Sequence, residues 1–167
     1  MRRFDSDALL SAVADRGKLS RPLIFGLAEN IAQFHGSLPY VIAPDEHERL
    51  RAVIEENDRC LTEQSNKTFQ SLRVEKLLIM SELFLEKLAP LLDARGETGH
   101  IRHCHGDLHL ANICLWNGEP TLFDCLEFNE ELATIDVLYD VAFLLMDLWH
   151  RSLHLEANML FNRYLDM

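Results

Sequence analysis

Helical spacing of apolar residues runs through most of this chain and gives way once, between Gly99 and Asp124, to short segments rich in β-prone residues. This pattern predicts a mainly α fold (α+β) with one small β-hairpin, and it leaves no room for a large sheet. At 167 residues, of which 48% are hydrophobic and 26% charged, the chain is long enough for one domain with a sizeable core. We therefore expect a single domain over residues 1–167.

The segment before Gly99 is expected to be entirely helical. In the second of its helices, opened by Ser20 and Pro22, apolar residues recur at intervals of three and four, which predicts one buried face. The third helix has a narrower apolar stripe, so it is expected to be more exposed. The predicted helices cover residues 6–17, 20–36, 45–64 and 69–95.

Short strands are expected after Gly99. The runs "IRHCH" and "ICLW" are rich in β-prone residues, and Asn117-Gly118 separates "ICLW" from "PTLFD" as a tight hairpin turn would. From Glu131 the spacing is helical again and is expected to remain so to the end of the chain. Residues 137–148 are apolar on nearly all sides, which predicts a helix at the centre of the core.

Charge and composition exclude several classes of protein. Sixteen Lys and Arg against twenty-seven Asp and Glu give a net charge of −11, which disfavours binding to nucleic acid or to an anionic membrane. The longest apolar run, residues 141–146, is far below the roughly 20 residues that a membrane helix needs. Asp5 and Asp7 stand where a secretory signal would be apolar, and the four cysteines form no Cys-x-x-Cys pair. We expect a cytoplasmic protein without a nucleic-acid or membrane partner.

The stretch "HCHGDLHLAN", residues 103–112, holds too many polar groups for an ordinary core segment. One interpretation is a zinc-dependent hydrolase, because alternate residues of an extended segment point to one side. Its ligands would be His103, His105, Asp107 and His109. Leu108, however, breaks the His-x-His-x-Asp-His motif of metallo-β-lactamase-like hydrolases, and the flanks are helical. The remaining histidines are expected to be surface residues or hydrogen-bonded braces: His35, His47, His100, His150 and His154.

The other interpretation is a phosphotransferase catalytic loop. Asp107 is followed five residues later by Asn112, and Asp124 ends the segment after the predicted hairpin. Phosphoryl transfer needs an aspartate that accepts the proton of the attacking hydroxyl, and an amide oxygen and a second carboxylate that hold magnesium on the phosphates. The spacing of these three residues is typical of that chemistry.

The segment "HGDLHLANICLWNGEPTLFD" resembles the catalytic loop, hairpin and metal-binding segment of the aminoglycoside phosphotransferase and choline kinase-like family, whose fold is that of the protein kinases. The segments "IDVLYDVAFLLMDL" and "LAENIAQFHGSLP" are similar to two helices of its C-terminal lobe, so the likeness runs from about residue 20 to the end. The resemblance implies that Asp107 is the catalytic base and that Asn112 and Asp124 bind Mg²⁺. It also implies ATP as the phosphoryl donor, with His105 and Asp140 supporting the loop.

The chain departs from the family pattern in two respects. Relatives often carry an acid two residues after the metal-binding aspartate, where this chain has Leu126, with Glu127 next. The seven glycines form no Gly-x-Gly-x-x-Gly, and the lysines lie in helical or polar surroundings. We therefore expect a kinase-like C-terminal lobe, a fragment without its nucleotide-binding N-terminal lobe, that has little or no activity alone. The chain most resembles a bacterial subgroup in which a P-loop kinase domain can be joined to this one, so such a domain and the N-terminal lobe are expected partners.

The expected reaction is transfer of the ATP γ-phosphoryl group to a hydroxyl of a small molecule. The acidic balance of the chain suits a cationic acceptor. The alternative is a non-catalytic binding module that keeps the loop but works through its helical surface.

Overall fold

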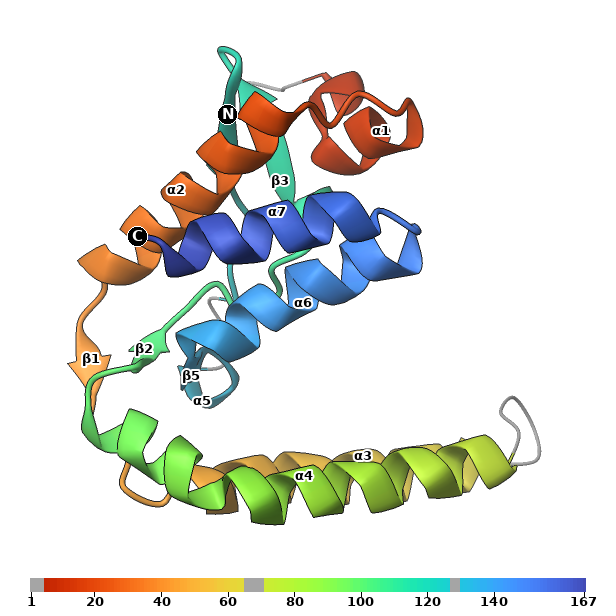
Figure 1. Cartoon of the computed structure of the whole chain (residues 1–167), viewed down its shortest axis with the longest axis vertical. Helices are drawn as coiled ribbons and strands as arrows, with labels where there is room; N and C mark the ends of the chain where they lie inside the picture. Colours follow the sequence, from red (N-terminus) through yellow and green to blue (C-terminus); the bar gives the residue numbers. More distant parts are fainter. Residues whose placement is uncertain (1–4, 65–70, 127–129) are drawn as a thin grey trace. The chain divides into compact units, whose positions relative to one another are not determined.

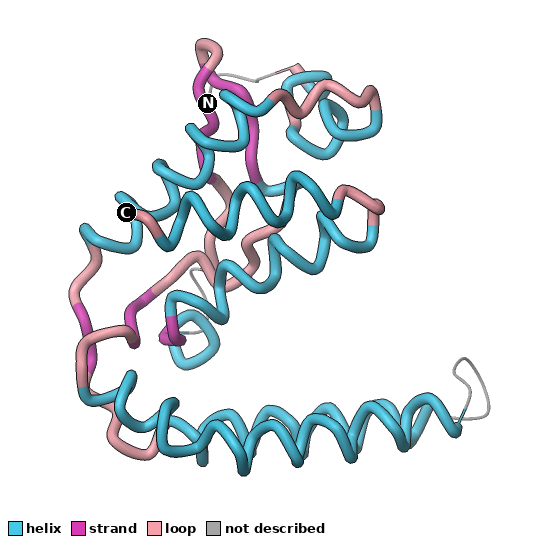
Figure 2. The backbone as a smooth tube through the Cα atoms, viewed as in Figure 1, coloured by secondary structure: helices cyan, strands magenta, loops and turns pink. Residues whose placement is uncertain are grey.

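The computed structural model describes residues 5–64, 71–126 and 130–167 (Figure 1). Helices predominate, with short antiparallel strands between them, so the predicted mainly α fold with a small β component is confirmed (Figure 2). The helices are α1 (Leu10–Asp15), α2 (Arg21–Ser37), α3 (Glu46–Gln64), α4 (Ser71–Glu97), α5 (Glu130–Ala133), α6 (Val137–His150) and α7 (His154–Leu165). The strands are β1 (Tyr40–Val41), β2 (Ile101–His103), β3 (Ile113–Trp116), β4 (Glu119–Leu122) and β5 (Thr134–Asp136). Two 3₁₀ turns, η1 (Ser6–Ala8) and η2 (Leu110–Asn112), complete the described elements.

The chain divides into two compact units, and the division falls in β1. The first unit comprises Met1–Tyr40 and Ile101–Met167, and the second comprises Val41–His100. The assignment of residues 1–167 to one kinase-like lobe stays a prediction. Within the described residues, no helix combines the length and the apolar character that crossing a membrane requires.

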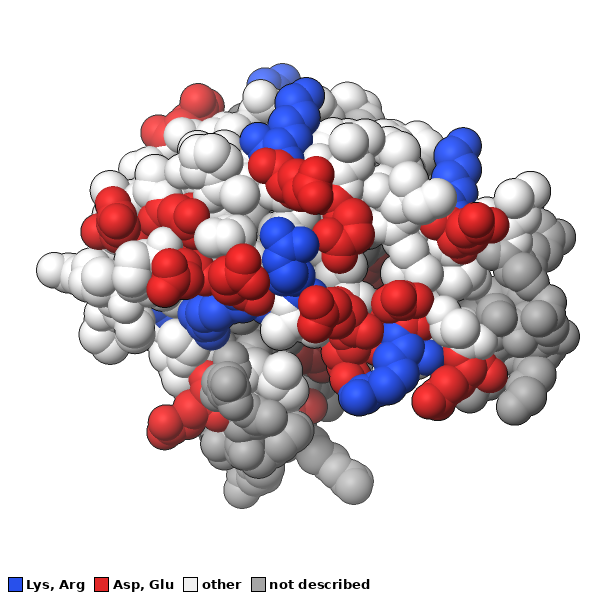
Figure 3. All heavy atoms as spheres, turned by 90° about the horizontal axis from the view of Figure 1, so that it is seen from below, with Lys and Arg blue, Asp and Glu red and all other residues white. Residues whose placement is uncertain are grey.

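The second unit consists of the helices α3 and α4, which pack against each other. Val74 and Leu85 of α4 are buried, and Pro90 lies inside this helix. The predicted start of α4 at Phe69 lies outside the described residues, whereas its predicted end near Arg95 is confirmed within two residues. Acidic and basic side chains lie next to one another on the face that Figure 3 shows. The described ion pairs of this unit include Arg51 with Glu82, at 3.2 Å.

A hydrogen-bonded pair, His47 of α3 and Asp93 of α4, links these two helices. Nδ1 of His47 lies 2.7 Å from Oδ1 of Asp93, and the His47 backbone N–H donates to the same oxygen. The hydrogen bond to Asp93 raises the pKa of His47 above 6.5, and the nearby Glu48 adds to this effect. The same hydrogen bond lowers the pKa of Asp93 below 3.8. Because the pKa of His47 is raised on folding, this histidine stabilises the folded state below pH 6.5, and the stabilisation is lost as the pH rises through the pKa of the folded state. Because the pKa of Asp93 is lowered, this aspartate stabilises the folded state above pH 3.8, and the stabilisation is lost as the pH falls through the pKa of the folded state.

We expect this link between α3 and α4 to be strongest between about pH 4 and pH 6.5. Asp93→Asn should return the pKa of His47 toward its ordinary value and should flatten the loss of stability above neutral pH. Histidine ring NMR titrations of the wild type and the variant measure the first effect, and urea unfolding at pH 5.5 and 8.5 measures the second. His100, which contacts the Thr98 hydroxyl, is the reference histidine. An unchanged His47 titration in Asp93→Asn would contradict the assignment.

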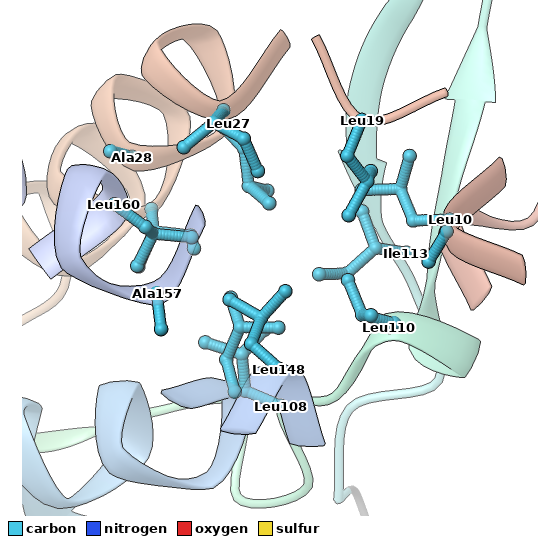
Figure 4. Packing of buried hydrophobic residues seen from close by; sticks show 14 of the residues in the cluster. Leu10, Leu19, Leu27, Ala28, Leu108, Leu110, Ile113, Leu148, Ala157 and Leu160 are labelled. Carbon is cyan, nitrogen blue, oxygen red and sulfur yellow. The ribbon is translucent and has the colours of Figure 1, made fainter. Parts of the chain in front are cut away.

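The core of the first unit lies between α2, α6, α7 and the segment around η2 (Figure 4). Ser20 caps α2, because its hydroxyl oxygen accepts from the backbone N–H of Leu23 at 3.4 Å. Most of the predicted apolar face of α2 is buried, and so are the facing residues of the two later helices: Ile24, Leu27, Ala28, Ile31, Val141, Leu144, Leu148, Ala157 and Leu160. The prediction that residues 137–148 contribute to the core is confirmed by the full burial of Val141, Leu144 and Leu148.

The helical spacing from Glu131 onward does not correspond to one continuous helix. The short helix α5 is followed by β5, which pairs antiparallel with β2 so that Ile101 faces Asp136. A further break separates α6 from α7, where Ser152 has a φ of 62°. Local periodicity does not reveal β5, because this segment becomes a strand by pairing with β2, more than thirty residues earlier in the chain. Asp136 also ends the strand, because its side chain accepts from the backbone N–H of Leu138 and caps α6.

The predicted hairpin is confirmed. Strands β3 and β4 pair antiparallel, and Trp116 faces Glu119 across the turn. Asn117 and Gly118 both have positive φ, of 52° and 86°. These are the backbone angles of the tight turn that best matches the twist of paired strands. The observed first strand is shorter than the predicted run "IRHCH": β2 ends at His103.

Candidate functional site

Asp140, in the first turn of α6, holds the start of the polar loop. Its Oδ1 accepts from the backbone N–H of Gly106 at 2.9 Å, and its Oδ2 accepts from the backbone N–H of His105 at 3.2 Å. The side chain of Asp140 is fully buried. A buried carboxylate is stabilised by N–H donors and by the N-terminal end of a helix dipole. The carboxylate therefore fixes the backbone immediately before Asp107.

A second carboxylate on the same helix holds the end of the loop. Oδ2 of Asp147 accepts from the backbone N–H of Leu110 at 2.9 Å, and its Oδ1 accepts from Nε of Arg151 at 2.8 Å. This pairing raises the pKa of the Arg151 guanidinium. The sequence analysis did not select Asp147. A signal was present, because Asp147 follows Asp140 by seven residues, or two helical turns, and so lies on the same face of α6.

Asn112 closes the loop onto Asp107. Its Nδ2 donates to the Asp107 carboxylate oxygen Oδ2 and to the Asp107 carbonyl oxygen, both at 3.0 Å. The Asn112 side chain is buried, whereas that of Asp107 is 46% exposed. His109 lies beside the other carboxylate oxygen, with Nε2 at 3.4 Å from Oδ1. Because both bonds use the amide nitrogen, and no donor among the described residues reaches the amide oxygen, that oxygen is available to a ligand.

The backbone on both sides of Asp124 is tied to this loop. The N–H of Phe123 donates to the carbonyl oxygen of Asn112 at 3.1 Å, and the N–H of Leu126 donates to the carbonyl oxygen of His105 at 2.9 Å. Asp124 itself is exposed and has a φ of 61°, which is uncommon for a residue other than glycine. Such strained angles persist only where the surrounding structure enforces them. These two backbone hydrogen bonds therefore hold Asp124 beside the loop that carries Asp107 and Asn112.

His105 lies between the loop and the Asp124 segment. The side chain is fully buried, and its Nε2 lies 2.9 Å from the carbonyl oxygen of Phe123. Since a carbonyl oxygen only accepts, Nε2 carries the proton and donates. In the neutral ring Nδ1 is then unprotonated, and it has no hydrogen-bond partner among the described residues. His105 thus contacts the Asp124 segment through both its ring and its backbone.

The four residues of the zinc interpretation do not converge. The extended segment ends at His103, which is exposed, whereas His105 points into the interior. The alternation of side chains that an extended strand produces therefore ends before it could place all four side chains on one side. Within the described residues, the group of histidine, cysteine and carboxylate side chains close enough to share an ion is His35, Cys104 and Asp140. Burial raises the pKa of the Cys104 thiol, which disfavours the thiolate that a metal requires.

The residues that the resemblance assigns to magnesium have suitable chemistry. Asp124 offers an exposed carboxylate and Asn112 a free amide oxygen, and Mg²⁺ prefers hard oxygen ligands while keeping several waters. Glu127, the acid that follows Leu126, lies outside the described residues. The oxygen set at the loop therefore fits a magnesium ion.

Comparisons with known proteins identify the family of this chain. The profile of the phosphotransferase enzyme family matches residues 10–166. Uncharacterized proteins of Mycobacterium tuberculosis and Mycobacterium bovis are 31% identical to this chain over 151 residues, which cover 89% of the chain but 30% of each relative. The chain thus spans about a third of the length of these curated relatives. No solved structure is a significant match. Because the family profile matches nearly the whole length of the chain, the chain belongs to the phosphotransferase enzyme family, which has a protein kinase-like fold.

Proposed function

We propose that this chain carries the catalytic base and the magnesium ligands of an ATP-dependent phosphotransferase that acts on a hydroxyl group of a small molecule. One observation supports the proposal above the others. The Asn112 amide donates to the Asp107 carboxylate at 3.0 Å, while the backbone on both sides of Asp124 is bonded to the same loop. A base and two oxygen ligands held in one place are what phosphoryl transfer requires of this part of the protein.

In this proposal Asp107 is the proton acceptor. The oxygen of the acceptor hydroxyl bonds to the γ-phosphorus of ATP, the bond from that phosphorus to the ADP oxygen breaks, and the hydroxyl proton passes to the Asp107 carboxylate. Asn112 orients the carboxylate through Oδ2, which leaves Oδ1, 3.4 Å from Nε2 of His109, to receive the proton. Asp124 and the amide oxygen of Asn112 would hold Mg²⁺, which neutralises charge on the phosphates.

We propose a cationic small molecule as the acceptor, because a net charge of −11 attracts such a compound. The chain has no glycine-rich phosphate loop in its sequence, and positioning by both lobes carries most of phosphoryl transfer. We therefore expect the chain by itself to turn over slowly at best. The relatives are about three times as long as the matched segment, so other domains of such a protein could supply the glycine-rich loop and the second lobe.

Calorimetric titration with Mg²⁺-ATP tests the proposal. The wild type should bind the complex, and Asp124→Ala should weaken the binding at least about tenfold, because a metal-binding carboxylate is lost. Asp166→Ala is the matched control, since Asp166 is an exposed carboxylate beyond the end of α7. Equal affinities in the wild type and Asp124→Ala would contradict the assignment. In any preparation with measurable turnover, Asp107→Asn should lower kcat by about 10²- to 10⁴-fold while leaving the Mg²⁺-ATP affinity unchanged.

A further inference from the structure

A line of buried hydrogen bonds leads from the last helix, α7, to the backbone beside Asp107. Tyr164 contacts His35, His35 contacts Asp140, and Asp140 holds the loop. We infer that Tyr164 is a positioning residue for the catalytic loop, and that it acts through His35 and Asp140. The inference rests on the proposed function for its catalytic meaning, although its structural content is measured independently.

Asp140 receives three N–H donors. Besides the two backbone groups of the loop, Nε2 of His35 lies 3.0 Å from its Oδ2. The side chains of Asp140 and His35 are 0% and 3% exposed, so water does not compete for these bonds. The backbone N–H of His105 shares Oδ2 with His35. The position of the carboxylate, and with it the backbone before Asp107, therefore depends on His35.

The direction of the bonds follows from the chemistry of the groups. A carboxylate bonded to backbone N–H groups accepts, so His35 donates from Nε2. In the neutral ring Nδ1 then accepts, and the Tyr164 hydroxyl, 2.9 Å away, is its donor. The Tyr164 ring also meets the His35 ring edge-on, with centroids 5.7 Å apart. Tyr164 thus supplies the hydrogen-bond donor for Nδ1, the nitrogen that does not bond to Asp140, and it fixes the plane of the imidazole.

Both ends of this line are anchored by other contacts. Nη1 of Arg102, on the strand that leads into the loop, donates to the carbonyl oxygens of His35 and Leu38 at 2.6 and 2.9 Å. Arg163, the residue before Tyr164 on α7, bonds to Glu29 of α2 at 2.7 Å. The two helices pack against each other, and Figure 4 labels four of the residues that they contribute to the core: Leu27, Ala28, Ala157 and Leu160. Tyr164 is therefore held on a rigid surface and can orient His35.

Removing the hydroxyl leaves a buried imidazole nitrogen without its donor. A buried polar atom that loses its partner costs its full desolvation penalty, which exceeds the net contribution of a typical hydrogen bond. The His35 ring is then free to turn away from Asp140, and the two backbone N–H groups of the loop open more often. Since Gly106 directly precedes Asp107, the carboxylate of Asp107 would lose its fixed position.

Amide hydrogen exchange by NMR tests this inference in Tyr164→Phe, which keeps the ring and removes only the hydroxyl. We expect the amides of His105 and Gly106 to exchange about fivefold to tenfold faster than in the wild type, the equivalent of one hydrogen bond. The core amide of Leu144 reports global stability and shows how far the change destabilises the protein as a whole. Arg163→Gln is the matched control, because it removes a contact between the same two helices without touching His35. In this control the loop amides should keep their wild-type rates.

Two results would overturn the inference. One is wild-type exchange of the loop amides in Tyr164→Phe. The other is equal acceleration of the loop amides in Tyr164→Phe and in Arg163→Gln, which would mean a general loss of stability. Neither result depends on Mg²⁺-ATP, so a failure of the proposed function in the Asp124→Ala titration is distinguished from a failure here. Where turnover is measurable, Tyr164→Phe should lower kcat and leave the KM for the nucleotide unchanged.

Discussion

Asp140→Asn is expected to lower the free energy of unfolding by about 2–3 kcal/mol, a large part of the stability of a small domain. The carboxylate accepts with both oxygens, from Gly106 on Oδ1 and from His105 and His35 on Oδ2. An amide of the same size has one oxygen, so its NH₂ group must face at least one of these N–H donors. The site is fully buried, and water cannot replace the lost bonds.

Urea unfolding of the wild type and of the variant measures this loss. Asp147→Asn is the comparison, because Asp147 also holds the loop but is 19% exposed. An amide there can keep its oxygen toward Leu110 and lose only the partly exposed contact with Arg151, so we expect about 1 kcal/mol. Equal losses of unfolding free energy in Asp140→Asn and Asp147→Asn would show that the burial of Asp140 does not increase its contribution to stability.

Gly106→Ala is expected to destabilise the protein by about 3 kcal/mol and to weaken Mg²⁺-ATP binding. Gly106 has a φ of 79°, which costs other residues about 1–2 kcal/mol. A Cβ there would also lie 2.6 Å from Cδ1 and 3.2 Å from Cβ of Leu126. Overlap of this size displaces side chain or backbone, at about 1–3 kcal/mol. Because Leu126 follows Asp124 by two residues, the displacement reaches the proposed metal ligand.

Two further variants separate the backbone cost from the overlap. Gly118 has a similar φ of 86° with nothing near its Cβ position, so Gly118→Ala should cost only the backbone part, about 1 kcal/mol. Leu126→Ala removes the nearest atom, so the double variant Gly106→Ala/Leu126→Ala should be less unstable than the sum of the two single changes. Additive losses, or equal effects of the alanine at positions 106 and 118, would refute the proposed overlap. Urea unfolding and calorimetric titration measure both consequences.

Local chemistry was sufficient to predict several elements. The helix α2 follows from Ser20 as a cap and from apolar residues at intervals of three and four, all within one continuous segment. The hairpin of β3 and β4 follows from Asn117-Gly118, because few residue pairs adopt these backbone angles at low cost. The same holds for the pair Asp107 and Asn112, whose five-residue separation is short enough for a direct hydrogen bond.

Elements that depend on distant partners were not predicted. Strand β5 lies in a segment with helical spacing and becomes a strand through its pairing with β2. Tyr164 carries no local sign of its contact, since its partner His35 lies 129 residues away. The spacing of Asp147 from Asp140 indicates a shared helix face, but it does not reveal the partner Leu110, 37 residues away. Long-range contacts of this kind depend on how the helices pack, which periodicity does not encode.

By itself, the sequence determined that the protein is mainly helical, that a small hairpin follows a polar loop, and that this loop has the spacing of a phosphotransferase. These properties depend on residues close together in the chain, where backbone preference and side-chain reach limit the possibilities. Only the tertiary structure decided through which hydrogen bonds Asp140 holds the loop and that Asp147 also holds it. It also decided that His105 faces inward while His103 is exposed, and that Asp124 adopts a positive φ beside the loop. These features arise because a buried polar group must find a partner, and the packing of distant helices decides which group that partner is.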